Sequence, residues 1–227
     1  MPEEVEAFLG ETPRLATDLA DFSSARIGDQ EAVIASCGLG KVRAAMTASI
    51  MLERWNCRAL VSAGTAGGLD RILPMQVVVA HEVVMHDYGR SRGAGELDLF
   101  RPGDPPLPEY QQVPIALSVP AERRRSSEAA VRDIDFVRFG TFASGDTFVN
   151  DDATRRRLIE LGAVAVDMEC AAVAQIAEYF EVPWLIAKGI SDIASSLSHQ
   201  DFLDGLAEAS RRSRTVVEAL LPEIEPG

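Results

Sequence analysis

Acidic residues stand in three short segments of the 227-residue chain, each beside small or apolar residues. They are Asp146 in TFASGDTFVN (141–150), Asp167 and Glu169 in VDMEC (166–170), and Asp192 in KGISDIA (188–194). Because Asp and Glu are rarely fully buried without a partner, these acids are either turn and cap residues or the lining of a shared pocket. Carboxylates in one pocket would stabilise positive charge that develops on a substrate.

The apolar pattern alternates between short strand-like runs and helical spacing along most of the chain. This alternation is typical of an α/β layered fold with a largely parallel sheet. We expect strands at 31–39, 57–64, 75–87, 136–146, 163–170 and 182–192, and helices at 41–55, 151–162, 168–181 and 199–221. Residues 88–120 are rich in proline and glycine and are expected to form a long loop.

Each acidic segment follows one of the expected strands, as do the glycine-rich turns GLG and GTAGG. Ligands of open α/β sheets bind outside the carboxyl ends of the strands, so this edge is the expected pocket. Glycine allows a close backbone approach at such a place. The candidate glycines are Gly38, Gly40, Gly64, Gly67 and Gly68.

Composition excludes several functional classes. The formal net charge of −13 argues against a surface for nucleic acid or for an anionic membrane. Three cysteines without a CxxC pair make a disulfide framework improbable, so a reducing cytoplasm is expected. No apolar run approaches the roughly 20 residues of a spanning helix, and the acidic start does not resemble a signal peptide. The length predicts a single domain over 1–227.

Familiar cofactor and metal motifs are not found in the sequence. It contains no GxGxxG, no GxxxxGK[ST], no HExxH, no GxSxG and no Cys/His cluster, so no cofactor and no metal are expected. An acid-rich pocket suits cleavage of a glycosidic bond. That reaction builds positive charge on the sugar and requires an acid for the leaving group and an activated water.

The motifs GLGKV, GTAGGL, SGDTFVN, VDMECAAVA and ISDIA occur in this order from about Met1 to beyond Phe202. The set resembles the purine nucleoside phosphorylase/nucleosidase superfamily, and most closely its 5'-methylthioadenosine/S-adenosylhomocysteine nucleosidases. The resemblance implies a nucleoside phosphorylase-like fold, a three-layer αβα sandwich with a mixed central sheet, in a homodimer. It implies hydrolysis of the N-glycosidic bond of 5'-methylthioadenosine and/or S-adenosylhomocysteine to adenine and a 5-thioribose product, in methionine salvage.

The resemblance also implies the catalytic residues. Asp192 would be the general acid that protonates the purine, and Ser191 would hold it. Glu4, together with Thr65, would position the attacking water. An Asp at position 192 favours a 6-aminopurine over a 6-oxopurine, because a carboxylate accepts from an amine and repels a carbonyl.

Substrate-binding positions follow from the same resemblance. Glu169 and Met168 would bind the ribose, with Glu169 on the sugar hydroxyls. Phe148 would stack on the base, and Val149 would offer it main-chain hydrogen bonds. Leu39 and Phe202 would line the pocket for the 5' substituent. Asp146 is expected to be a turn residue rather than a catalytic one.

The chain departs from the family pattern at three places. Relatives have a short strand before the PEEV-like segment, so either the start is truncated or that strand is missing and Glu4 is poorly held. Lys188 stands where a relative has Arg, and the 88–120 loop is longer than in the best-known members. Ser62 stands where related phosphorylases carry an Arg for phosphate, which favours hydrolysis.

Three alternatives to this assignment stay open. They are a phosphate-dependent purine nucleoside phosphorylase, a hydrolase for a futalosine-type nucleoside that the longer loop would accommodate, and a non-catalytic nucleoside-binding protein on the same scaffold.

Overall fold

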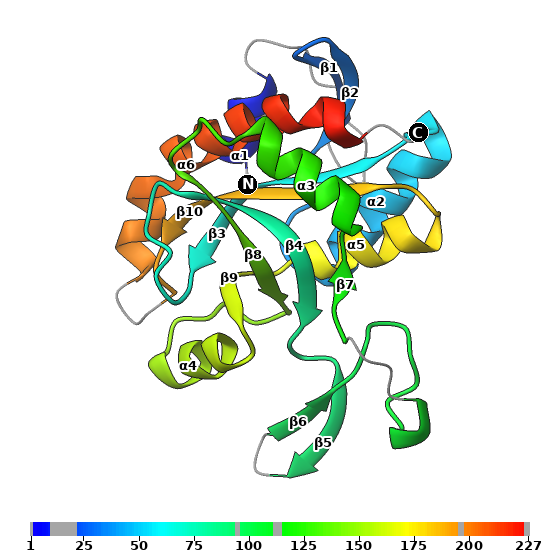
Figure 1. Ribbon diagram of the computed structural model, residues 1–227, viewed down its shortest axis with the longest axis vertical. Helices are drawn as coiled ribbons and strands as arrows, with labels where there is room; N and C mark the ends of the chain where they lie inside the picture. Colours follow the sequence, from blue (N-terminus) through cyan, green and yellow to red (C-terminus); the bar gives the residue numbers. More distant parts are fainter. Residues whose placement is uncertain (1, 10–21, 94–95, 111–114, 195–197, 225–227) are drawn as a thin grey trace.

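A mixed six-stranded sheet forms the centre of the protein. The computed structural model describes residues 2–9, 22–93, 96–110, 115–194 and 198–224, and it is drawn in Figure 1. The sheet has the order β10-β3-β9-β8-β4-β7, with a further pairing between β10 and β4 that joins distant strands of this order. Its strands are β3 (Leu60–Gly68), β4 (Val77–Met85), β7 (Leu117–Ser118), β8 (Val137–Ser144), β9 (Ala163–Asp167) and β10 (Trp184–Asp192).

Helices cover both faces of this sheet. Figure 1 shows α1, α3 and α6 on one side and α2 and α5 on the other, with α4 beside β9. The helices are α1 (Pro2–Leu9), α2 (Lys41–Trp55), α3 (Ala121–Ala130), α4 (Asp152–Glu160), α5 (Cys170–Tyr179) and α6 (Ser198–Leu220), and short 3-10 turns are η1 (Pro108–Tyr110) and η2 (Leu221–Ile224). The expected three-layer αβα sandwich is therefore confirmed.

Small apolar side chains bring α2 and α5 close to the sheet. Ala44 and Ala48 of α2 are buried together with Ala171 and Ala174 of α5 in one hydrophobic cluster. Alanine favours the helix and adds little bulk, so the two helices pack closely over the strands. All nine residues of β10 are buried, including polar ones. Such full burial is typical of a central strand covered on both faces.

The largely parallel sheet expected from the alternation is wrong in part. The β10–β3, β4–β8 and β8–β9 pairs are parallel, whereas β10–β4, β3–β9 and β4–β7 are antiparallel. The β3–β9 pair joins only Gly67 to Val166 and Gly68 to Ala165. The parallel strands β10 and β3 therefore run opposite to β8 and β9, and the carboxyl ends of β3 and β9 lie side by side. This arrangement still brings the expected segments to one place.

The 88–120 segment is more ordered than the expected loop. It contains a hairpin of β5 (Gly89–Gly93) and β6 (Glu96–Leu99) that projects from the body in Figure 1. Arg90 and Arg92 both pair with Asp98 across this hairpin. The strands are short and mostly exposed, so they lack the apolar alternation from which a strand is predicted.

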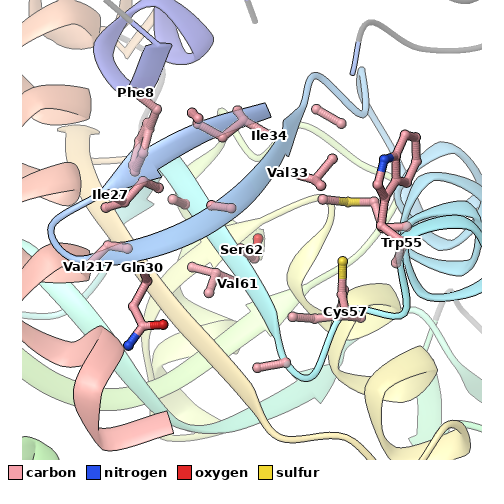
Figure 2. Close-up of a pocket in the computed structure, with 18 of the residues that line it drawn as sticks. Phe8, Ile27, Gln30, Val33, Ile34, Trp55, Cys57, Val61, Ser62 and Val217 are labelled. Atoms are coloured by element: carbon pink, nitrogen blue, oxygen red, sulfur yellow. The ribbon is translucent and has the colours of Figure 1, made fainter. Parts of the chain in front are cut away.

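A second hairpin lies beside β3 and faces a cavity. It consists of β1 (Phe22–Ile27), which the sequence did not reveal, and β2 (Gln30–Ala35). Figure 2 shows the cavity, of about 1230 Å³, between this hairpin, α2 and β3, with Phe8 of α1 on its wall. Within the described residues, β2 pairs only with β1, and β3 pairs with β10 and, at its last two residues, with β9. Two strand edges therefore face what we call the β2–β3 cavity.

Candidate active site

Glu4, on α1, reaches the carboxyl half of β3. Its Oε1 accepts hydrogen bonds from the Thr65 amide at 2.8 Å and from Thr65 Oγ1 at 2.7 Å. A Cβ on Gly64 would come within 2.7 Å of Glu4 Oε1, so this glycine gives the carboxylate its room. Burial would raise the pKa of Glu4, but Lys188 and Thr65 are among the groups that together lower it. Glu4 is therefore an ionised acceptor at neutral pH.

Lys188 is a buried cation held between two carboxylates. Its Nζ lies 2.5 Å from Asp167 Oδ2 and 3.1 Å from Glu169 Oε2, and the residue is 3% exposed. Burial would lower the pKa of Lys188, but Asp167, Cys170 and Glu169 raise it well above its usual value. Burial would likewise raise the pKa of Asp167, and Lys188 with the Cys170 hydrogen bond lowers it. Lys188 and Asp167 are therefore both charged, and Glu169 places a second carboxyl group beside the same cation.

Asp167, the last residue of β9, also binds the first N–H group of helix α5. Its two carboxylate oxygens accept from the Cys170 amide at 3.0 and 3.2 Å, which satisfies one of the free N–H groups of the first turn. Ser144 Oγ accepts from the Ala171 amide at 3.2 Å. Glu169 is the N-cap residue of α5 but makes no cap bond with its side chain. Its carboxylate is consequently turned toward Lys188 and the pocket.

Asp192 ends β10 and is 3% exposed. Its Oδ2 accepts from Ser191 Oγ at 2.9 Å, and its Oδ1 accepts from the Ala194 amide at 2.7 Å. Ser191 Oγ also lies 3.3 Å from the Ala66 carbonyl oxygen. A hydroxyl has one proton, so when Ser191 donates to Ala66 its oxygen can accept a hydrogen bond from a protonated Asp192. This arrangement can hold either protonation state of the Asp192 carboxyl group.

The predicted acids lie in one region. In the parallel β10–β3 pair, Thr65 is in register with Gly189 and Gly67 with Asp192. Burial raises the pKa of the Cys37 thiol. The nearby carboxylates of Glu169 and Glu4 raise it further, whereas Lys188 lowers it, so Cys37 lies close to these charged groups. The structure thus brings Glu4, Thr65, Glu169, Ser191 and Asp192 together, as expected from the sequence.

The remaining predicted residues are placed differently from one another. Met168 is half-buried beside Glu169, and Phe148 is 48% exposed. Leu39 is 64% exposed, directly before the turn that precedes α2. The Val149 side chain is buried in the cluster around α4, so only its main chain is free for the role expected of it. The side chain of Phe202 lies outside the described residues.

Sequence reasoning undervalued Lys188, Asp167 and Asp146. Lys188 is a lysine in the otherwise apolar strand VPWLIAKG, and this was the available signal, because a buried lysine needs a buried anion. The Asp146 carboxylate does not stabilise its own turn alone, since its Oδ1 accepts from the Lys41 amide at 2.8 Å, at the start of α2. That contact joins residues 105 positions apart, and no local pattern predicts it.

Within the described residues, no group of three or more His, Cys, Asp and Glu side chains is arranged to hold a metal ion. None of the described helices is long and apolar enough to cross a membrane. The arrangement that does exist can protonate a leaving group at Asp192, orient a water at Glu4, and place a carboxylate beside a cationic transition state at Glu169.

Comparisons with known proteins agree with this chemistry. The sequence matches the model of the phosphorylase superfamily over residues 1–222. It is 34% identical over 217 residues to a 5'-methylthioadenosine/S-adenosylhomocysteine nucleosidase of Mycobacterium bovis, covering 88% of this chain and 85% of the relative.

Two solved structures show how similar the fold is. The nucleosidase of the same name from S. pneumoniae, bound to a transition-state inhibitor, has a TM-score of 0.82 and 25% identity, with 99% and 96% of the two chains covered. The futalosine hydrolase of Helicobacter pylori has a TM-score of 0.83 at 23% identity, with 98% and 94% covered. This second likeness concerns the fold alone.

Proposed function

The chain belongs to the phosphorylase superfamily, and we propose that it is a purine nucleosidase that hydrolyses 5'-methylthioadenosine and/or S-adenosylhomocysteine. The products are adenine and the 5-thioribose compound. The observation that carries the proposal is the convergence of Asp192, Glu4 and Glu169 at the meeting ends of β3, β9 and β10. The relative from Mycobacterium bovis bears the name of this activity.

Asp192 is the general acid of the proposed reaction. The C1'–N9 bond breaks as the purine takes a proton, and a buried carboxyl group aligned by Ser191 and by the Ala194 amide supplies it. The Ser191 hydroxyl can reverse its hydrogen bond when Asp192 changes protonation state. A purine with a 6-amino group also gives the carboxylate a donor to accept from.

Glu4 orients the water that attacks C1'. Thr65 fixes Oε1 of Glu4 with two hydrogen bonds, and the carboxylate held in this way is the group that would accept a proton from water. The lowered pKa keeps Glu4 ionised for this purpose. Water supplies the hydroxyl group that bonds to C1', and its proton passes to Glu4.

Glu169 binds the sugar and stabilises its developing positive charge. Its carboxylate is held by Lys188 at 3.1 Å and by the Gly40 amide at 3.1 Å. Because it sits beside Asp167 with only one cation between them, the local charge is negative. A fixed negative charge lowers the energy of an oxocarbenium-like transition state.

The same charge balance favours hydrolysis over phosphorolysis. Lys188 is the buried cation of this region, and both of its neighbours are carboxylates. A phosphate bound there would be repelled by the two carboxylates, and the cation between them is already paired. Ser62 is buried and lies 3.9 Å from Cys170 Sγ, so its position offers no charge either.

We further propose a single domain over 1–227 and a homodimer. Leu39, Val42 and Phe148 are large apolar side chains that are exposed at the rim of the site, and a second copy would cover them. Three free cysteines suit the reducing cytoplasm, where the enzyme would act in methionine salvage.

Product analysis tests the proposed function. The protein is incubated with 5'-methylthioadenosine, S-adenosylhomocysteine, adenosine, inosine and futalosine, each with and without phosphate, and free base is measured by chromatography. Adenine release from the thio-nucleosides without phosphate is the expected result. Release only with phosphate would establish a phosphorylase, release only from futalosine the other hydrolase, and binding of adenine without any turnover a binding protein.

Replacement of the proposed acid tests the mechanism. Asp192→Asn should lower kcat by about 10²–10⁴-fold, because Asn has the same shape but cannot supply the proton. Circular dichroism and thermal unfolding should stay close to those of the unmodified protein. Asp151→Asn, at an exposed N-cap where Asn is equally suitable, is the matched control and should leave kcat unchanged. A normal kcat in Asp192→Asn would remove Asp192 from the mechanism.

A further inference from the structure

The turn before α2 is tied to two other loops through charged groups. Lys41, the first residue of α2, places its Nζ 2.5 Å from Asp87 Oδ1 and 3.7 Å from Asp146 Oδ2. Its amide donates to Asp146 Oδ1 at 2.8 Å. Asp87 Oδ2 in turn accepts from the Asp146 amide at 2.8 Å. Lys41, Asp87 and Asp146 therefore form a closed ring of contacts, which we call the Lys41 clamp.

The Asp87 carboxylate of the clamp is held as an anion. Burial would raise the pKa of Asp87, but the Lys41 hydrogen bond and the Asp146 amide lower it. Asp146 accepts from the first N–H of α2, where the helix dipole favours a negative charge, and the N-cap residue Gly40 has no side chain to do this. The clamp thus supplies from another loop the cap that α2 lacks.

Two glycines allow the backbone to approach the carboxylates of the Lys41 clamp closely. A Cβ on Gly145 would come within 2.5 Å of His86 Nε2 and within 3.0 Å of Asp87 Cγ, and a Cβ on Gly40 within 3.1 Å of Asp146 Oδ1. Gly40 also has φ of 92°, a left-handed conformation in which other residues are strained. The backbone at Gly40 is therefore set by its neighbours rather than by its own preference.

The Gly40 amide is the link from the clamp to the site. It donates to Glu169 Oε1 at 3.1 Å, while Lys188 holds the other oxygen. Lys188 lies in the centre of β10 and is fixed by the core, whereas Gly40 lies in the turn next to Lys41, whose amide and ammonium groups are held by Asp146 and Asp87. The direction of the Glu169 carboxylate thus depends on one rigid contact and on one that the clamp maintains.

We propose that Lys41 and its partners Asp87 and Asp146 are positioning residues that aim the Glu169 carboxylate at the sugar. This inference rests on the proposed role of Glu169 in sugar binding. It assigns no contact with the substrate to Lys41, which acts through the backbone of Gly40. The clamp should consequently affect ligands that contain the sugar and leave the binding of the free base unchanged.

A merely structural ion pair would behave otherwise. The side chains of Lys41 and Asp87 are 18% and 26% exposed, and ion pairs at such a surface contribute little to stability. The pair between Arg124 and Glu82, on α3 and β4, has side chains 28% and 35% exposed and lies 3.3 Å apart, so it is a matched control outside the site.

The test measures KM, kcat and inhibition by adenine in Lys41→Met, Asp87→Asn, the double variant and Glu82→Gln. We expect KM for 5'-methylthioadenosine to rise about tenfold in both single clamp variants, as for a weakened hydrogen bond to a charged group. The inhibition constant of adenine should stay within about twofold. The double variant should be no worse than either single one, because both remove the same contact. Lys41→Arg keeps the positive charge, so its KM should rise less than that of Lys41→Met. Glu82→Gln should leave KM, kcat and the inhibition constant of adenine unchanged.

Each failure has its own signature. Turnover by the unmodified protein together with an unchanged KM in Lys41→Met and Asp87→Asn would overturn the clamp and leave the proposed function intact. An equal loss of nucleoside and adenine binding would assign the ion pair to general integrity of the fold, and so would also overturn it. Absence of turnover in the unmodified protein, with every nucleoside tried, would overturn the proposed function and the clamp with it.

Discussion

At the scale of single residues, Lys188 determines the charge balance of the site. It separates Asp167 from Glu169, and it lies on a strand in which all nine residues are buried. A buried ion pair adds little to stability compared with an apolar pair, but removing one partner leaves an isolated buried charge. The intact pair therefore adds little net stability, whereas loss of Lys188 alone would be costly.

Removing this cation should destabilise the protein strongly. Lys188→Met leaves Asp167 and Glu169 side by side without a counter-charge, so the free energy of unfolding should fall by about 3–5 kcal/mol. Urea unfolding measures the loss. Lys188→Arg keeps the charge and should lose much less. A loss no greater in Lys188→Met than in Lys188→Arg would mean that the pair is not buried in solution.

The same pair predicts a dependence of stability on pH. The pKa of Asp167 is lowered in the folded protein, so its ionised form stabilises the fold above the unfolded-state pKa of about 3.9. This contribution is lost as the pH falls through the folded-state pKa. The free energy of unfolding should therefore decrease on going from about pH 5 to pH 3, and the decrease should be smaller in Lys188→Met. Equal slopes in the two proteins would exclude Asp167 as the source.

The segments that converge at the candidate site were predictable where a motif marks them. Asp192, Glu169 and Thr65 stand in segments that resemble the family pattern, and the structure brings them together. The clamp was not predictable, because Lys41, Asp87 and Asp146 stand on three segments that become neighbours only after folding. Contacts of this kind leave no periodic signal in the sequence.

At the scale of secondary-structure elements, β10 and α6 are in close contact. Gly189 is the point of contact, since a Cβ at this position would overlap the carbonyl group of Ala209 in α6. The strand carries Lys188, Ser191 and Asp192, so the position of α6 fixes the position of the acid. A glycine in a strand interior often marks such a close backbone approach.

A side chain at this contact should disturb both stability and activity. Gly189→Ala should lower the free energy of unfolding by about 1–3 kcal/mol, because a well-packed interior resists added volume. It should also lower kcat, since α6 and β10 must move apart next to Asp192. Thermal unfolding and turnover are the two measurements. Unchanged values for both would show that the layers are less closely packed than the structure describes.

Elements were predicted best where packing repeats a simple period. The helix expected at 41–55 is α2 without a shift, and the helix expected at 151–162 begins after the N-cap Asp151. The exposed hairpin of β5 and β6 and the strand β1 were missed, because their side chains do not alternate clearly between core and solvent. Strand direction could not be predicted either, because a buried strand has the same apolar sequence pattern in parallel and antiparallel pairs.

At the scale of the whole molecule, the β2–β3 cavity interrupts the close packing of the interior. It lies between β2 and β3. Within the described residues, the facing edge of β2 has no strand partner, and that of β3 is paired only at its last two residues, with β9. Its walls include Ala32 and Ile34 of β2 and Val61 and Ala63 of β3. Unpaired strand edges and apolar walls are the two features that an added strand would satisfy.

A strand placed in this cavity should stabilise the protein. Glu4, Val5 and Phe8 of α1 line the same cavity, so a segment fused directly ahead of Pro2 could enter it and run toward Thr65. We expect a fused segment of about six alternating Val and Thr residues, a length typical of strands, to raise Tm by about 4 °C or more.

The gain would come from burying apolar surface and from pairing two edges at once, and the first turn of α1 would be held more firmly. Glu4 would then be better fixed against Thr65, so kcat should rise or stay the same rather than fall. A fused segment of equal length made of Gly, Ser and Pro is the control, because it cannot pair with either edge. An equal Tm for the two fusions would mean that the cavity closes in solution and that the hairpin β1–β2 packs directly on β3.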